Sequence, residues 1–242
     1  MEHRDYCTRI GREAGLLRAT ALAAGPDAAV PTCPGWTVQR LVSHVARAYG
    51  MVIGVVQSAD PSTPPPRPGW PAGDFDAVLA GYDEQLASLL ELLTGTDPAT
   101  PAWHFSPTAP KTVAFWSRRM AHETTVHRID AQAATGEGTG VDPDFAADGV
   151  DEVLTRLIQR HTDAWAVGEL SGTVLHHAAD AGRAWTTRLV AGQLPQTAPE
   201  TVAEPDASVV GLADAVYRAC WGRPSHAVVS GDPALLRAAR GR

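Results

Sequence analysis

Four segments in the first 135 residues repeat apolar side chains every three or four positions, and glycine- or proline-rich stretches separate them. A period of about 3.6 residues predicts amphipathic helices, each with one apolar stripe to bury. Long helices joined by loops pack side by side, so the pattern predicts an antiparallel four-helix bundle. The expected helices cover residues 3–24, 37 to beyond 52, 74–95 and 112–135, and the breaks fall at Gly25-Pro26, the proline-rich loop 57–73, Gly95 and Gly136.

After about residue 140 the pattern changes from long helices to short runs. A fifth helix is expected over about 143–162, followed by two strand-like runs on either side of Asp180-Ala181-Gly182, a hairpin signal. Further strands are expected in "DASVVG" and "HAVVSGD", and further helices in "LADAVYRACWG" and "DPALLRAAR". The sequence therefore predicts an α+β protein, with a helical domain over residues 1–140 and a smaller α/β domain over residues 141–242.

Composition argues against several classes of protein. The formal net charge is −7 and the basic residues form no cluster, which disfavours nucleic acid as a partner. No apolar run approaches the ~20 residues of a membrane span, and the N-terminus has no signal-peptide core. Cys7, Cys33 and Cys220 are too scattered for a disulfide framework or a zinc ribbon. A reduced cytoplasmic protein, either a monomer or a homodimer, is expected.

The segment "FWSRRMAHETTVHRIDAQ" in the fourth expected helix carries an acid and two imidazoles within six residues. Glu123 and His127 are four residues apart and share one helix face, whereas His122 is turned about 100° away. His44, at the edge of the apolar stripe of the second helix, is the candidate third ligand. Two imidazole nitrogens and a carboxylate, with a fourth position open, are the donor set of a catalytic zinc site. The alternative is a solvated helix face and a packed histidine.

Three separated stretches resemble one known family. "VPTCPGWTVQRLVSHVARAYG" is similar to the start of the mycothiol-dependent maleylpyruvate isomerases, which belong to the DinB-like superfamily of metal-binding four-helix bundles. "RRMAHETTVHRIDAQAATG" resembles the family's second metal segment, and "GTVLHHAADAGRAW", "LADAVYRACWGRP" and "VSGDPALLRA" resemble its C-terminal domain. The resemblance implies a zinc ion held by His44, Glu123 and His127, with mycothiol as the thiol that takes the open position.

The chemistry implied by this resemblance is attack of a thiol on an electrophilic small molecule. Zinc lowers the pKa of a thiol and holds it as the thiolate near pH 7. An isomerase and a thiol S-transferase share this first step, so the metal motif does not separate them. A non-catalytic metal- or ligand-binding member of the same fold is the alternative.

Only Lys111 among the 20 basic residues is a lysine. This bias is typical of GC-rich genomes and fits an actinobacterial source.

Other polar residues near these motifs have two interpretations each. Arg223, in "CWGRP", resembles an arginine of the family's C-terminal domain, which implies a catalytic role in pairing with a substrate carboxylate; a surface arginine is the alternative. Asp130 either orients the imidazole of His127 or lies as a charge at the helix rim. Arg119 could reach an anion, but a surface ion pair is expected. Cys33 lies near a helix start, where a thiol could be activated, but a small buried residue in a turn is expected.

Overall fold

The computed structural model describes residues 1–71, 73–160 and 168–241, and the chain divides into two compact units. Unit 1 comprises residues 1–104 and 110–139, and unit 2 comprises residues 105–109 and 140–242. Within the described residues, no helix is both long and apolar enough to cross a membrane.

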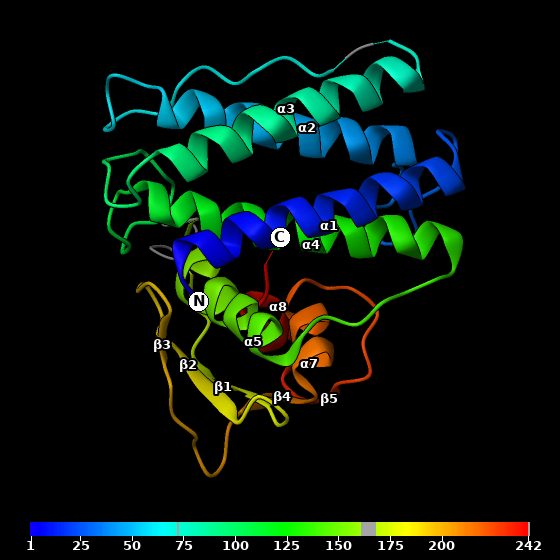
Figure 1. The fold of residues 1–242 in the computed structure, drawn as a ribbon. Coiled ribbons are helices and arrows are strands. Elements are labelled where there is room, and N and C mark those ends of the chain that lie inside the picture. Colours follow the sequence, from blue (N-terminus) through cyan, green and yellow to red (C-terminus); the bar gives the residue numbers. More distant parts are fainter. Residues whose placement is uncertain (72, 161–167, 242) are drawn as a thin grey trace. The chain divides into compact units, whose positions relative to one another are not determined.

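Unit 1 is a bundle of the four expected helices. These are α1 (His3–Ala24), α2 (Val38–Val56), α3 (Phe75–Gly95) and α4 (Val113–Thr135). Helix α1 packs against α4 and α2 packs against α3, while α2 also contacts α4 and α1 contacts α3; Figure 1 shows the two pairs as two layers. The predicted helical N-terminal domain is confirmed.

Local sequence explains where these helices begin and end. The Thr37 hydroxyl accepts a hydrogen bond from the backbone N–H of Arg40, and the Asp74 carboxylate caps α3 through the N–H of Ala77. Gly136, with φ of 74°, takes the left-handed conformation that closes α4. The apolar stripe of α2 lies wholly in the core, where its residues Val38, Leu41, Val42, Val45, Tyr49 and Val52 are all buried.

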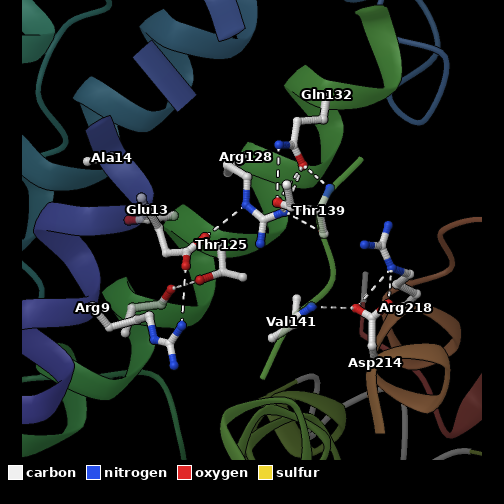
Figure 2. A network of polar contacts seen from close by, with 12 residues as sticks. Arg9, Glu13, Ala14, Thr125, Arg128, Gln132, Thr139, Val141, Asp214 and Arg218 are labelled. Carbon is white, nitrogen blue, oxygen red and sulfur yellow. Dashed lines mark hydrogen bonds and ion pairs between the residues drawn. The ribbon is translucent and has the colours of Figure 1, made fainter. Parts of the chain in front are cut away.

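A buried ion pair ties α1 to the C-terminal half of α4 (Figure 2). The guanidinium of Arg128 donates from Nε to the carboxylate of Glu13 over 2.8 Å, and both side chains are almost completely buried. Its Nη1 donates to the Gln132 side chain at 2.7 Å and to the backbone oxygen of Thr139 at 2.9 Å. A buried pair is tolerated only when its remaining hydrogen-bonding groups are satisfied, and this network satisfies them.

Unit 2 has helices on one face of a mixed sheet. Its elements are α5 (Pro143–Glu152), β1 (Gly172–Ala178), β2 (Arg183–Leu189), β3 (Gln196–Ala198), β4 (Ala207–Gly211), α7 (Ala213–Cys220), β5 (Val228–Gly231) and α8 (Pro233–Ala238). Among the described residues the strand order is β3-β2-β1-β4-β5, with β1 and β4 parallel and the other neighbours antiparallel. The expected hairpin, the two further strands and the two short helices are all present, and Figure 1 shows α5, α7 and α8 on the same side of the sheet.

The alternation of β1 decides which of its residues lie under the helices. Val174, His176 and Ala178 are buried, whereas the intervening residues are only half-buried. Leu235 of α8 belongs to the same apolar cluster as Val174 and Ala207, so α8 covers this face of the sheet.

The fifth helix is shorter and less regular than the apolar period predicts. The α-helix ends at Glu152 and continues as a π-helical turn over Val153–Leu157 and a 3-10 turn over Ile158–Arg160. The predicted end at residue 162 lies outside the described residues. Buried Val153, Leu154 and Leu157 keep the apolar period through the turn, because a π turn changes the hydrogen-bond spacing without breaking the helical path.

The buried imidazole of His176 leads us to expect that the stability of the chain depends on pH. It is 2% exposed and its Nδ1 has no hydrogen-bond partner, and burial lowers its pKa to about 4. Unfolded histidine takes up a proton near pH 6.5, so the unfolded state binds more protons than the folded state between about pH 6.5 and 4. The free energy of unfolding should therefore fall across that window, by roughly 3 kcal/mol in total at about 1.4 kcal/mol per pH unit.

Urea unfolding of the wild type and of His176→Phe, measured at several pH values from 7 to 4, tests this expectation. The phenylalanine ring fills similar space but does not titrate, so the variant should lose less stability on acidification. Equal losses in the two proteins would show that His176 is not the titrating group.

Candidate metal centre

Three side chains expected to act as ligands converge inside unit 1. Nε2 of His44 lies 3.1 Å from Oε1 of Glu123, and Nε2 of His127 lies 3.2 Å from the same oxygen. The two imidazole rings meet edge to face with their centroids 4.8 Å apart. One ligand atom from each residue lies within 4.8 Å of the others. The structure thus brings together residues that are 79 positions apart in the chain.

The helices place these groups through simple geometry. Glu123 and His127 are one turn apart on α4, and His44 comes from the facing side of α2, which packs against α4. His122 is fully buried and its ring lies 6.5 Å from that of Tyr6 on α1. It takes no part in the cluster, as the helical offset predicts.

Arg119 holds the second oxygen of the Glu123 carboxylate. Its Nη2 donates to Oε2 at 2.8 Å, which leaves Oε1 directed at the two imidazoles. Burial raises the pKa of Glu123, but hydrogen bonds from His127 and His44 and the charges of His127 and Arg119 hold it well below its usual range. Arg119 is 4% exposed, so the expected surface ion pair is wrong: the arginine is one of the many buried residues of α4 and pairs there with Glu123.

Asp130 fixes the other side of the His127 ring. Its Oδ2 accepts a hydrogen bond from Nδ1 of His127 at 2.9 Å, while Oδ1 accepts one from the Thr32 hydroxyl at 2.6 Å. The Sγ of Cys33 also lies 3.5 Å from Oδ2. Because Asp130 is completely buried, it is not a charge at the helix rim. A carboxylate bound to Nδ1 directs Nε2 of the same ring toward Glu123 and His44.

The charge on His127 follows from its two acidic neighbours. Burial by itself lowers the pKa of this imidazole, but the hydrogen bonds and charges of Asp130 and Glu123 raise it to about 9. Without a metal the ring is therefore protonated at neutral pH and forms ion pairs with both carboxylates. A cation that bound at Nε2 would replace this proton.

The donor set fits a divalent ion such as zinc. Two imidazole nitrogens and one carboxylate oxygen converge, and the side chains of His44, Glu123 and His127 are 30%, 19% and 10% exposed, so one side of the cluster is open. Cys33, His127 and Asp130 form a second group with ligand atoms within 4.8 Å of one another. There the hydrogen bond from Nδ1 to Asp130 already occupies the shared histidine. The group of His44, Glu123 and His127 is therefore the better candidate for binding a metal ion.

Aromatic and cationic side chains surround His44, and the sequence interpretation did not identify them. The rings of Trp36 and Trp70 have centroids 4.9 Å and 6.2 Å from that of His44. The guanidinium groups of Arg40 and Arg47 lie over the Trp70 ring. The spacing of Arg40, His44 and Arg47 along α2, four and then three residues, is a signal that they share one face.

Arg223 belongs to unit 2, just after α7. Its Nη1 donates to the backbone oxygen of Trp221 at 2.7 Å, and the side chain is half-buried. It contributes to the wall of a pocket of about 320 Å³ together with His176, Arg237 and Arg240.

Replacing Asp130 with asparagine should lower the pKa of His127. The amide keeps a hydrogen-bond acceptor but loses the negative charge, so in metal-free protein the pKa should fall from about 9 to roughly 7, a change expected from the loss of one adjacent charge. Titration of the imidazole signals by NMR measures this. Asp76→Asn, at an exposed position in the first turn of α3, is the control of equal charge and should leave His127 unchanged. An unchanged pKa in Asp130→Asn would contradict the assigned contact.

Comparison with known proteins agrees with this architecture. A family model described as the mycothiol maleylpyruvate isomerase N-terminal domain matches residues 7–132, and one described as the MDMPI C-terminal domain matches residues 144–238. No match was found among the curated proteins.

Two solved structures share the fold. The chain is similar to the crystal structure of the mycothiol-dependent maleylpyruvate isomerase, with 13% sequence identity, a TM-score of 0.66, and coverage of 95% of this chain and 93% of that chain. A histidine-to-alanine variant of that isomerase gives the same identity and coverage, with a TM-score of 0.67. Because the two family models together span most of both units, the chain belongs to the mycothiol-dependent maleylpyruvate isomerase family.

Proposed function

We propose that this protein is a zinc-dependent enzyme that uses mycothiol to attack an electrophilic small molecule. The observation that carries the proposal is the convergence of His44, Glu123 and His127 on one partly open point in unit 1. Membership of the isomerase family supports mycothiol as the thiol. The free cysteines and the lysine-poor composition support a cytoplasmic protein from an actinobacterium.

The three ligand residues have distinct tasks in this proposal. The zinc ion would lower the pKa of a bound thiol and so supply the nucleophile near neutral pH. His44 and His127 provide neutral nitrogen donors, and Glu123 provides one negative charge through Oε1. Arg119 restrains the carboxylate from behind, and Asp130 holds the His127 ring by its far nitrogen. Contacts of this kind keep ligands oriented for the metal.

Two reactions are compatible with this arrangement, and isomerisation is the one that the family supports. In isomerisation, a carbon–sulfur bond forms at an activated double bond, the adjacent carbon–carbon bond rotates, and the carbon–sulfur bond breaks again, so the thiol is regenerated. In an S-transferase reaction the carbon–sulfur bond persists and the thiol is consumed. Product analysis with one equivalent of mycothiol separates the two, because only isomerisation continues past one turnover.

A member of the family that binds a metal or ligand without catalysis is the alternative function. The complete ligand set and the supporting contacts of Arg119 and Asp130 favour the enzyme. Metal analysis of the purified protein, followed by calorimetric titration with mycothiol, discriminates the two. A binding protein would take up the metal or the thiol and show no turnover with any electrophile.

Removing either imidazole ligand should abolish stoichiometric zinc binding. His44→Ala and His127→Ala each remove one of three protein ligands, and a two-ligand site does not retain zinc firmly. Metal content measured by atomic emission should fall from one ion per chain to near zero, and thiol-dependent activity should fall with it. His122→Ala is the neighbouring control, since that side chain faces Tyr6 and should leave the metal content unchanged.

Circular dichroism of each variant shows whether its helices are intact. The metal assignment is wrong if folded His44→Ala protein still binds one zinc ion with wild-type affinity, or if folded His122→Ala protein loses it.

We also propose that Arg223 pairs with a carboxylate of the substrate. Charge-assisted, two-pronged hydrogen bonds to a carboxylate are strong, so Arg223→Ala should raise the KM for an anionic substrate by about 10–100-fold, or ~1.5–3 kcal/mol. Zinc content should stay at the wild-type level. Arg188→Ala, at an exposed position in β2 of the same unit and outside the wall of that pocket, is the matched control. Wild-type kinetics in Arg223→Ala would assign this arginine to the surface.

A further inference from the structure

One face of α2 carries a cation on each side of the proposed ligand His44. Arg40 precedes His44 by four residues and Arg47 follows it by three, so the three side chains emerge from the same side of the helix. On an α-helix, four residues correspond to a rise of about 6 Å. The side chain of Arg40 is therefore attached to α2 about one helical turn from His44, which faces the proposed metal centre.

Trp70, from the proline-rich loop between α2 and α3, contacts both cations through its rings. The guanidinium carbon of Arg40 lies 3.4 Å from the centroid of a Trp70 ring, and that of Arg47 lies 4.5 Å from it. Arg47 also donates from Nε to the backbone oxygen of Pro68 at 2.9 Å. Arg47 therefore fastens the loop to α2, and the loop in turn holds Trp70 beside His44.

Arg40 differs from Arg47 in what its nitrogens contact. Stacking on Trp70 occupies one flat face of its guanidinium, and Trp36 lies at 5.9 Å. Within the described residues, no hydrogen bond or ion pair from this side chain to the protein is found, and the residue is exposed. Stacking engages the face of a guanidinium and leaves the N–H groups at its edge free to donate.

We infer that Arg40, stacked on Trp70, is a specificity-determining residue that binds a carboxylate of the small electrophile processed at the proposed metal centre, separate from the carboxylate assigned to Arg223. The inference rests on the proposed function. A planar guanidinium with free edge donors matches the two oxygens of a carboxylate, which it binds through two parallel hydrogen bonds. Nearness to His44 suits a short acid, whose electrophilic carbon lies only a few bonds from its carboxylate.

The geometry also explains why a lysine would not serve as well in this position. An ammonium group is a compact point charge that neither stacks as a plane nor presents a two-pronged edge. The tryptophan ring restricts the guanidinium to one orientation before a ligand binds, so less conformational entropy is lost on binding. Trp70 is a positioning residue in this scheme, and Arg40 contacts the ligand.

The test compares binding of crotonate, a short unsaturated carboxylate, with that of crotonamide, its neutral analogue of similar shape. Calorimetric titrations at millimolar ligand concentration use the full, zinc-loaded chain. Wild-type protein should bind crotonate at least about tenfold more tightly than crotonamide, as expected for one charge-assisted pair. Arg40→Ala should lose this preference, and Arg40→Lys should retain only part of it. Trp70→Leu should weaken crotonate binding more than crotonamide binding, because it frees the guanidinium.

Arg12→Ala is the matched control, since Arg12 is an exposed arginine on α1 and its loss changes the net charge of unit 1 equally. It should keep the wild-type preference. The inference is overturned if wild-type protein shows no preference for crotonate, if the preference survives in Arg40→Ala, or if Arg12→Ala abolishes it equally. The ratio of the two affinities does not depend on turnover. A wild-type protein that selects crotonate but lacks thiol chemistry would therefore refute the proposed function and keep the carboxylate site.

Discussion

The carboxylate of Glu123 is the charge around which the interior of unit 1 is arranged. Removing an ionised carboxylate from water is costly unless cations and hydrogen-bond donors surround it. Here two imidazoles contact one oxygen and a buried guanidinium contacts the other. Since His44 comes from α2 and the remaining partners from α4, this compensation holds only when the two helices meet in one register. The lowered pKa of Glu123 and the raised pKa of His127 both result from that register.

Polar contacts continue around α4 on its other sides. Asp130 connects His127 to Thr32 in the loop that precedes α2. Arg128, the residue after His127 in α4, pairs with Glu13 of α1. Helix α4 also buries apolar side chains, among them Trp116, Met120 and Ile129. It therefore contributes to the apolar core and carries the functional polar groups as well. Two separate networks, which start from neighbouring residues of α4, thus orient the imidazole and anchor the helix.

The loop between α2 and α3 lies along one side of the cluster of His44, Glu123 and His127, next to His44. Proline fixes the backbone of such a loop and reduces the freedom it loses on ordering. Arg47 binds the backbone of Pro68, and Trp70 stacks on two guanidinium groups, so the loop has a defined place next to His44. The proposed metal centre is thus bordered by an aromatic surface and a cation, which supports the proposal that its electrophile is a small anion.

Periodicity and capping residues were sufficient to predict most of the elements. The apolar stripe of α2, the caps at Thr37 and Asp74, and the closing Gly136 are local features, and local features determine where helices begin, end and bury a face. The same holds for the β1–β2 hairpin. The π turn after Glu152 was not predicted, because the apolar period continues through it unchanged. The short strand β3 was not predicted, because it depends on pairing with β2.

For the site, the sequence by itself determined that Glu123 and His127 share a face, because four residues make one turn of a helix. It also determined that His122 points away from them. Only the tertiary structure decided that His44 meets this pair, that Arg119 and Asp130 are buried partners and not surface charges, and that Trp70 covers Arg40 and Arg47. The physical reason is that spacing fixes an angle around one helix axis, whereas contact between helices depends on how all of their side chains pack together.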